Sequence, residues 1–169
     1  MIDYDDFRIL ARMQKNAREP QKNVAADLAI SEASLSKKIN RLYNDHVIRR
    51  QTIDIDMSKV GLNISAMTLL KEKKQTDAAG LQALLCNFPE AYQVHKVTGE
   101  WDYTVLWNCI NPEHLDDVLS KVLDHPNVDK IQTFLFMRTL KQQNSASLEA
   151  LLESRKTSLN LSPPNGGRK

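Results

Sequence analysis

Apolar positions in the first 45 residues recur every three or four residues, a spacing that predicts three helices. The first helix begins at the N-cap Asp3 and ends near Asn16, and its buried stripe consists of Phe7, Leu10, Ala11 and Met13. The second begins at Pro20, which suits a first helical position, and ends at Leu28. Ser31 caps the third helix, whose apolar face consists of Leu35, Ile39 and Leu42. Three short helices of this kind predict a helix-turn-helix domain.

The opposite face of the third helix carries cations and hydrogen-bonding groups and no acid. A turn of about 100° per residue places there Ala33, Ser34, Lys37, Asn40 and Arg41, with Lys38 at the flank. In a helix-turn-helix protein such a face enters the major groove, where Asn and Arg read base edges and Lys neutralises phosphates. A solvated helix face with ordinary charges has the same composition, so this helix alone leaves both interpretations open.

Residues 47–56 are rich in β-branched side chains and alternate in polarity over part of their length, which predicts a short two-stranded ribbon. The ribbon carries Arg49 and Arg50, and three helices followed by a basic ribbon form a winged helix. The net charge of +2 is too small to indicate a nucleic-acid partner, but lysine and arginine residues are concentrated between Lys37 and Arg50. We therefore predict that double-stranded DNA is bound by Ser31, Ala33, Ser34, Lys37, Lys38, Asn40, Arg41, Arg49 and Arg50.

Beyond residue 61, strand-like and helix-like patterns alternate. Strands are expected at 62–70, 92–98, 103–110 and 128–140, with amphipathic helices before Pro89 and after Pro112. The order βαββαβ is supported by an internal repeat, in which residues 84–90 are echoed by residues 122–127. It predicts a ferredoxin-like unit with one open sheet face, whose candidate residues are Tyr92, Leu106, Phe134 and Phe136. A second copy that covers this face would make a homodimer, with room for higher assembly.

The predicted fold class is therefore α+β, with a winged helix-turn-helix domain at 1–60, a ferredoxin-like domain at 61–141, and a C-terminal helix (about 146–155) with a disordered tail at 142–169. Hydrophobic residues make up 41% and charged residues 26%, which is ordinary globular usage. No apolar run approaches the roughly 20 residues that span a bilayer, and the acidic N-terminus is unlike a signal peptide. We expect no membrane partner and a cytoplasmic location. Cys86 and Cys109 lack CxxC spacing and are expected to be small buried residues.

Two groups of motifs follow one another in a specific order. The first consists of Asp3-x-x-Asp6, Asn16-Ala17-Arg18, Ile30-Ser31, Arg41-Leu42 and Val47-Ile48-Arg49. The second consists of Val97-Thr98-Gly99-Glu100-Trp101-Asp102-Tyr103, then Thr133 and Arg138-Thr139-Leu140-Lys141. Over about residues 2–141 the chain thereby resembles the leucine-responsive regulatory protein/AsnC (Lrp/AsnC, feast/famine) family of transcriptional regulators. That family usually has glycine where this chain has Ala29 and His46, so a left-handed backbone at His46 would be strained by roughly 1 kcal/mol.

The resemblance implies that the second domain senses an amino acid and assembles dimers through its sheet, often onward to octamers. It places the effector near the turn at 99–103, and the implied effector-binding residues are Gly99, Glu100, Trp101, Asp102, Tyr103 and Thr133. A carboxylate of Asp102 or Glu100 would pair with the ammonium group of the amino acid, and backbone N–H groups of a glycine turn would bind its carboxylate. A turn-forming role for Asp102 and a plain strand role for Thr133 are the alternatives.

Two other functional classes compete with a regulator. Sirohaem decarboxylases share the two-domain layout, but they have a His-Asn-Tyr-x-Arg run where this chain has Gln93-Val94-His95-Lys96-Val97. The four histidines (His46, His95, His114 and His125) show no metal-ligand spacing, and no nucleophile arrangement or phosphate loop is present, so we predict no enzyme, metal or cofactor. A stand-alone amino-acid-binding protein with an idle winged helix conflicts with the basic face at 34–50. We predict a sequence-specific DNA-binding regulator modulated by an amino-acid-like effector.

Overall fold

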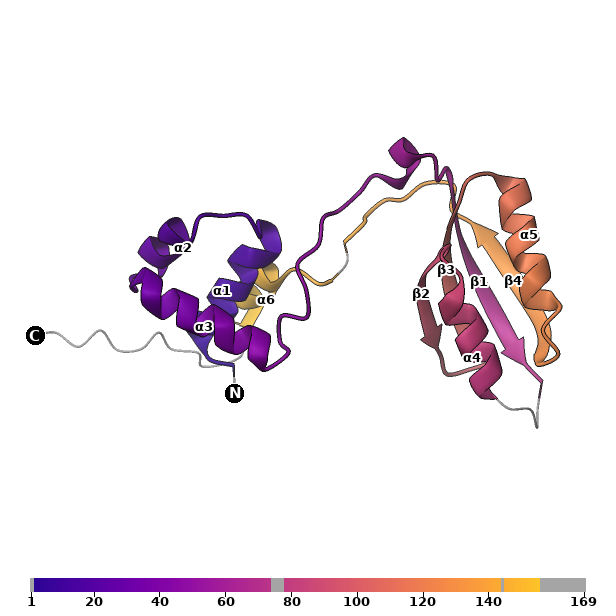
Figure 1. The fold of residues 1–169 in the computed structure, drawn as a ribbon, viewed down its shortest axis with the longest axis horizontal. Coiled ribbons are helices and arrows are strands. Elements are labelled where there is room, and N and C mark those ends of the chain that lie inside the picture. Colours follow the sequence, from indigo (N-terminus) through magenta and orange to yellow (C-terminus); the bar gives the residue numbers. More distant parts are fainter. Residues whose placement is uncertain (1, 74–77, 144, 156–169) are drawn as a thin grey trace, which may run out of the picture. The chain divides into compact units, whose positions relative to one another are not determined.

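A computed structural model describes residues 2–73, 78–143 and 145–155 of the 169-residue chain, and these form two compact units. Unit 2 is Asp54–Lys141. Unit 1 combines the residues up to Ile53 with the segment that follows Gln142, so a C-terminal helix belongs to the same unit as the N-terminal helices (Figure 1). The predicted disordered tail beyond residue 155 lies outside the described residues.

Unit 1 contains the three predicted helices, α1 (Tyr4–Lys15), α2 (Gln21–Leu28) and α3 (Glu32–Asn44). A reciprocal capping box begins α1, because Asp6 N–H donates to Asp3 Oδ1 at 2.7 Å and Asp3 N–H donates to Asp6 Oδ2 at 3.0 Å. Ser34 N–H donates to Ser31 Oγ at 3.1 Å, which confirms the predicted cap of α3. Pro20 precedes α2 as its N-cap and does not occupy the first helical position as predicted.

The core of unit 1 joins the inner faces of all three helices. Its buried members are Ile9, Val24, Ala25, Leu28, Leu35 and Leu42, with Leu10, Met13, Ile30, Ile39 and Ile48 packed around them. Only two of the four residues in the predicted buried stripe of α1 pack against this core. Leu10 and Met13 face this core, whereas Phe7 and Ala11 are outside it, and Ala11 is nevertheless only 8% exposed. A second packing surface on α1 explains that burial.

The second surface of α1 receives α6 (Leu148–Arg155), which packs against it. The side-chain amide of Gln14 holds the start of α6 by donating to Ser145 Oγ at 2.6 Å and to Ala146 O at 2.8 Å. The same amide accepts a hydrogen bond from Leu148 N–H at 2.9 Å, so Gln14 caps a helix that lies 134 residues further along the chain. The sequence predicted α6 but not its attachment.

Both α2 and α3 end in a left-handed residue that is not glycine. Ala29 has φ 54° and His46 has φ 55°. Each position closes the helix end, since Ile30 N–H donates to Ala25 O at 3.0 Å and Val47 N–H donates to Leu42 O at 2.9 Å. The two departures from the family's glycines therefore fall where glycine is favoured.

The predicted two-stranded ribbon at residues 47–56 is wrong: the chain has no strand between the end of α3 and the start of β1. The physical reason is the composition of the intended turn. Residues 49–52 contain neither glycine nor asparagine, and a two-residue hairpin needs positive φ at its centre. The segment instead runs extended and exposed to a short 3₁₀ helix, η1 (Met57–Val60).

Unit 2 has the predicted βαββαβ order. Its elements are β1 (Ile64–Glu72), α4 (Ala78–Asn87), β2 (Ala91–Lys96), β3 (Tyr103–Cys109), α5 (Pro112–Leu123) and β4 (Val128–Leu135). The strands pair antiparallel in the order β2-β3-β1-β4. Helices α4 and α5 lie on one face of the sheet (Figure 1), and the core between sheet and helices includes Leu70, Leu81, Leu85, Val105, Trp107, Val118 and Val122.

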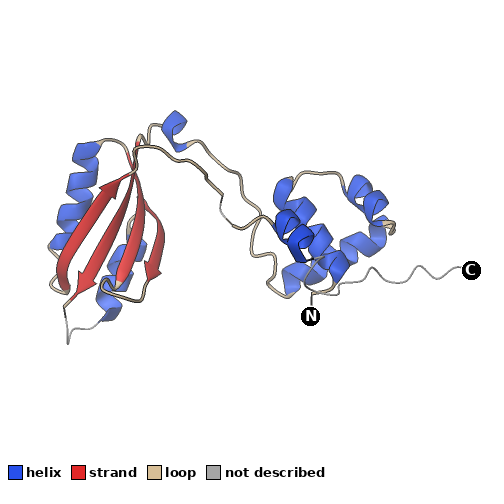
Figure 2. Cartoon of the chain, turned by 180° about the vertical axis from the view of Figure 1, so that it is seen from behind, coloured by secondary structure: helices blue, strands red, loops and turns tan. Residues whose placement is uncertain are grey.

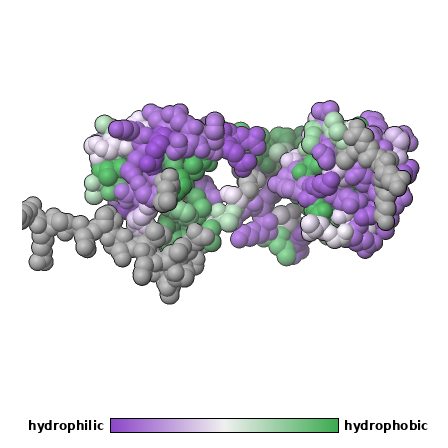
Figure 3. Space-filling model, turned by 90° about the horizontal axis from the view of Figure 1, so that it is seen from below, coloured by the Kyte–Doolittle hydropathy of each residue, from purple (hydrophilic) through white to green (hydrophobic). Residues whose placement is uncertain are grey.

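The other face of this sheet has no helix over it among the described residues, as the view from behind shows (Figure 2). Tyr92, Phe134 and Phe136 are 49%, 41% and 41% exposed, and Leu106 is half-buried, as expected for an open face. β4 ends at Leu135, so the predicted strand at 128–140 was five residues too long. Elsewhere hydrophilic side chains cover most of the surface seen in Figure 3, in keeping with two interior cores.

Candidate nucleic-acid interface and effector site

The predicted residues Ala33, Ser34, Lys37, Asn40 and Arg41 are all exposed on α3, as are Glu32 in its first turn and Asn44 at its end. Within the described parts of the chain, the side chains of Lys37 and Asn40 have no hydrogen-bond or ion-pair partner. Ser31 is engaged in the cap, and its Oγ lies 2.9 Å from Ser34 Oγ. The centre of the face therefore offers one free ammonium group and one free amide beside the small Ala33. These groups are suited to phosphates, to base edges and to close approach, respectively.

Lys38 and Arg41 differ from Lys37, because acids of α1 bind them. Arg41 Nη2 donates to Asp6 Oδ2, and Lys38 Nζ lies 2.8 Å from Asp3 Oδ2 and 3.5 Å from Asp6 Oδ1. The side chain of Asp6 is fully buried, that of Lys38 is 24% exposed and that of Arg41 is 45% exposed. We call these four residues the α1–α3 ion cluster. From the sequence, Arg41 was expected on the solvent face and Lys38 at its flank, and Asp6 was not expected as their partner.

The α1–α3 ion cluster shifts the protonation of its members. Burial would raise the pKa of Asp3, but the hydrogen bond from Lys38, with help from the N–H of Asp6, lowers it below its ordinary value. The hydrogen bond to Asp3 raises the pKa of Lys38 above its ordinary value against the opposing effect of burial. Both groups are therefore charged at neutral pH, and the contact is a true ion pair.

Two further parts of the chain add to the interface. Arg49 and Arg50 are exposed on the extended segment after α3, and neither has a partner among the described residues. Asn44 is exposed one helical turn beyond Asn40, and it was not among the predicted residues. Its i+4 spacing from Asn40 and i+7 spacing from Lys37 would have placed it on the same face. Asn44 thus joins the candidate interface between the predicted residues Arg41 and Arg49.

Asp102 is tied into the backbone at the end of β1. Glu72 N–H donates to Asp102 Oδ2 at 2.9 Å, Asp102 N–H donates to Leu70 O at 2.9 Å, and Lys71 Nζ lies 3.1 Å from Oδ2. The N–H of Glu72 lowers the pKa of Asp102 below its ordinary value, and Lys71 adds to this effect although burial opposes it. The carboxylate therefore already has partners. This geometry favours the turn-forming alternative for Asp102.

The rest of the turn at 97–102 is more accessible. Gly99 has φ +112°, and nothing lies within 4 Å of the position that a Cβ would take. The side chain of Glu100 is 71% exposed and pairs with Lys130 Nζ at 3.1 Å, and the same ammonium group lies 4.7 Å from the ring centroid of Trp101. The turn therefore presents a backbone open to a ligand beside an exposed carboxylate.

Tyr103 and Thr133 belong to the helix-covered side of the sheet. Tyr103 is 1% exposed, and its hydroxyl donates to Glu72 Oε2 at 3.3 Å. Thr133 Oγ1 lies 2.9 Å from Thr68 Oγ1, which also accepts the indole N–H of Trp107 at 2.9 Å. Both predicted residues are thus hydrogen-bonded within unit 2.

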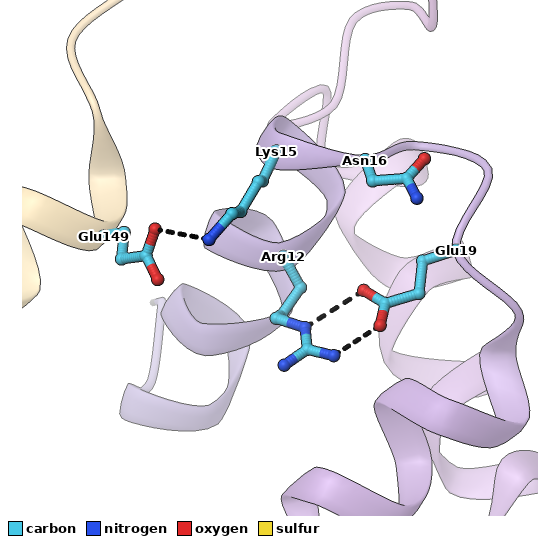
Figure 4. Close-up of a pocket in the computed structure, with 5 residues that line it drawn as sticks. All are labelled: Arg12, Lys15, Asn16, Glu19 and Glu149. Atoms are coloured by element: carbon cyan, nitrogen blue, oxygen red, sulfur yellow. Dashed lines mark hydrogen bonds and ion pairs between the residues drawn. The ribbon is translucent and has the colours of Figure 1, made fainter.

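Two surface cavities occur in unit 1. One of about 330 Å³ is lined by Arg12, Lys15, Asn16, Glu19 and Glu149, and its charges are paired, with Lys15 Nζ 3.4 Å from Glu149 Oε2 (Figure 4). The second, of about 380 Å³, lies between α1, α2 and α3 and includes Asn40 and Tyr43 in its lining. Neither includes a predicted effector residue. In the described residues no group of three or more His, Cys, Asp or Glu could hold a metal, and none of their helices is long and apolar enough to cross a membrane.

Comparisons with known proteins agree with this two-unit arrangement. Residues 2–49 match the family model of a winged helix-turn-helix DNA-binding domain, and residues 65–146 match the Lrp/AsnC ligand binding domain. The HTH-type transcriptional regulator LysM of Sulfurisphaera tokodaii is 32% identical over 121 residues, which cover 72% of this chain and 84% of that protein. The regulator Zrp of Zymomonas mobilis is 29% identical over 143 residues, which cover 83% of this chain and 94% of that protein.

Solved structures show the same fold. A transcriptional regulator of Neisseria meningitidis in complex with L-methionine superposes with a TM-score of 0.82 at 23% identity, over 89% of this chain and 99% of that one. AsnC of Escherichia coli superposes with a TM-score of 0.80 at 18% identity, over 86% of this chain and 99% of that one. The fold of this chain is thus shared along nearly the full length of both solved proteins.

Proposed function

Because the chain belongs to the Lrp/AsnC family of transcriptional regulators, we propose that it recognises an operator through α3 and adjusts this binding to an amino-acid-like effector held by unit 2. The family consists of regulators and not of enzymes, so the decarboxylase alternative is set aside. The observation that carries the proposal is the face of α3, where Lys37 and Asn40 are exposed and unpaired within the described chain.

The proposed DNA contacts divide into two kinds. Lys37, Arg49 and Arg50 are exposed cations that would neutralise phosphates and carry no sequence information. Asn40 and Ser34 would read base edges, since an Asn amide matches the N6 and N7 groups of adenine. Ala33 would allow close approach to the groove, and Ser31 would fix the start of the helix. Lys38 and Arg41 would take part from within the α1–α3 ion cluster.

Binding of fluorescent duplexes tests this division of roles. The specific probe is DNA from upstream of the chain's own gene, and random DNA is the reference. We expect Asn40→Ala to weaken only the specific complex, by about 1–3 kcal/mol. Lys37→Ala should weaken both complexes and reduce the salt slope by about 0.9. Lys121→Ala, an exposed lysine on α5, is the matched control and should change neither. Equal binding of both duplexes by the unaltered protein would refute the proposal.

The proposed effector site lies at the turn at 97–102. Its support is the open backbone at Gly99, the exposed carboxylate of Glu100, and the L-methionine complex of the similar Neisseria regulator. Trp101, Asp102, Tyr103 and Thr133 would shape the site from their bonded positions. Calorimetric titration with pooled amino acids, then with single ones, tests it. Glu100→Gln should weaken effector binding, because an amide cannot neutralise an ammonium group, whereas binding equal to that of the unaltered protein would remove Glu100 from the site.

A homodimer, assembling further to an octamer, is proposed through the open sheet face. Its support is the set of exposed apolar side chains there, which includes Tyr92 and Phe134. Phe134→Glu should dissociate the assembly in sedimentation velocity, and a variant that keeps its size would refute this interface. The proposed place of action is the cytoplasm, which holds operator DNA in bacteria and archaea such as those of its relatives.

A further inference from the structure

We propose that the buried carboxylate of Asp6 determines how well the protein discriminates operator from random DNA, because it withholds Arg41 and, together with Asp3, Lys38 from free phosphate binding. This inference rests on the proposed function, in which α3 contacts DNA. It assigns Asp6 a positioning role, since the carboxylate itself is remote from the exposed face.

The geometry makes Asp6 the link between α1 and α3. Its carboxylate is fully buried, yet it contacts two cations that lie 32 and 35 residues further along the chain. Oδ2 accepts from Arg41 Nη2 and from Asp3 N–H, and Oδ1 lies 3.5 Å from Lys38 Nζ. A capping residue needs only the bond within its own helix. The additional contacts with Arg41 and Lys38 therefore indicate a second role for Asp6 besides capping α1.

This second role concerns how many unpaired positive charges α3 has for binding to DNA phosphates. Three cations lie on α3 (Lys37, Lys38 and Arg41), and two of them are paired with acids of α1. Only Lys37 is without a partner among the described residues of the helix. Affinity for any DNA sequence rises with the number of phosphates that are neutralised. Pairing two cations internally therefore lowers binding to random DNA while the base-reading groups of α3 remain available.

Arg41 gains orientation from the same contact. One Nη is held by a buried carboxylate, while 45% of the side chain stays exposed. Its other nitrogens have no partner in the described part of the chain. A guanidinium fixed in this way loses less rotamer entropy when it meets a base than a free arginine does. Loss of Asp6 would thus raise non-specific binding and weaken specific binding together.

The experiment compares the salt dependence of random-DNA binding for the full-length protein and its variants. Asp6→Asn keeps the shape of the side chain and an acceptor for Asp3 N–H, but it removes the charge that holds Arg41, while Asp3 still holds Lys38 at 2.8 Å. Release of Arg41 should steepen the slope of log affinity against log salt by about 0.9, or about 3.5-fold in affinity between 50 and 200 mM. Preference for a duplex selected from a random pool should fall at least tenfold. Adding Arg41→Gln to this variant should restore the original slope.

A purely structural role predicts a different result. Val24→Ala removes core volume from unit 1 without changing any charge, so it should lower both affinities in parallel at an unchanged slope. The same behaviour by Asp6→Asn would overturn the inference. If Asp6→Asn does not fold, two single variants test the inference in its place. Lys37→Gln should reduce the slope of log affinity against log salt by about 0.9, and Lys38→Gln should leave that slope unchanged. Equal reductions would overturn the inference. If the unaltered protein does not prefer the selected duplex, the proposed function itself fails.

Discussion

Replacing Ala29 or His46 with glycine is expected to stabilise unit 1 by about 0.5–1 kcal/mol at each position. Both residues have a left-handed backbone at a helix end, which costs an L-amino acid roughly 1–2 kcal/mol. Glycine removes that cost but adds about 0.5–1 kcal/mol of unfolded-chain entropy, so part of the gain remains. Both side chains are exposed, and their removal therefore sacrifices little packing. The helix-end hydrogen bonds involve only backbone groups and persist in the variants.

Urea unfolding followed by helical circular dichroism measures this effect. Tryptophan emission provides an internal reference, because both tryptophans lie in unit 2 and report that unit. The two substitutions are far apart and share no partner, so the double variant should gain about 1–2 kcal/mol. Ala33→Gly is the matched control: this exposed alanine lies inside α3, where glycine costs about 1 kcal/mol. The reasoning is refuted if Ala29→Gly or His46→Gly loses stability as Ala33→Gly does.

Three further outcomes follow from the structure. Gln14→Ala should speed limited proteolysis near α6 several-fold because one amide makes three contacts there, whereas Lys15→Ala removes only an exposed ion pair and should change it little. Thr68→Val should destabilise unit 2 by about 1–3 kcal/mol and alter the near-ultraviolet dichroism, because the indole N–H of Trp107 loses its buried acceptor; an unchanged spectrum would contradict this. The lowered pKa of Asp102 stabilises unit 2 above the ordinary carboxyl pKa, and this contribution is lost as pH falls through the lowered value. Asp102→Asn should therefore be less stable than the unaltered protein at pH 7, and the difference should shrink below about pH 4 when tryptophan emission is followed.

Local patterns were sufficient for most of the fold. The N-cap Asp3, the cap of Ser31 and the βαββαβ order each depend on residues near one another in the chain, and each was found as predicted. The exposed position of Lys37 and Asn40 also follows from helical periodicity alone. Sequence reading was therefore reliable for these features, but Cys86, which was expected to be buried, is exposed on α4.

Most errors arose where the surroundings of a residue are determined by segments far away in the sequence. Periodicity could not show that Asp6 would bind Arg41 across 35 residues, or that Glu72 N–H would already occupy the carboxylate of Asp102. Ala11 is buried as predicted, but it and Phe7 lie outside the three-helix core, and local patterns could not show that α6 would pack against α1. The ribbon at 47–56 was predicted from β propensity, although its residues lack the turn chemistry that a hairpin needs.

The return of α6 to α1 has a consequence for the synthesis of the protein. Unit 1 is split in the chain, since α1, α2 and α3 are translated first, residues 54–141 follow, and α6 comes afterwards. At roughly 5–20 residues per second, synthesis of unit 2 is complete at Lys141 about 1–3 s before synthesis reaches the end of the helix that Gln14 caps. A nascent chain can therefore complete its sheet while its three N-terminal helices still expose the surface around Ala11. Translation thus orders the two halves, with the effector unit finished first and the DNA-binding unit last.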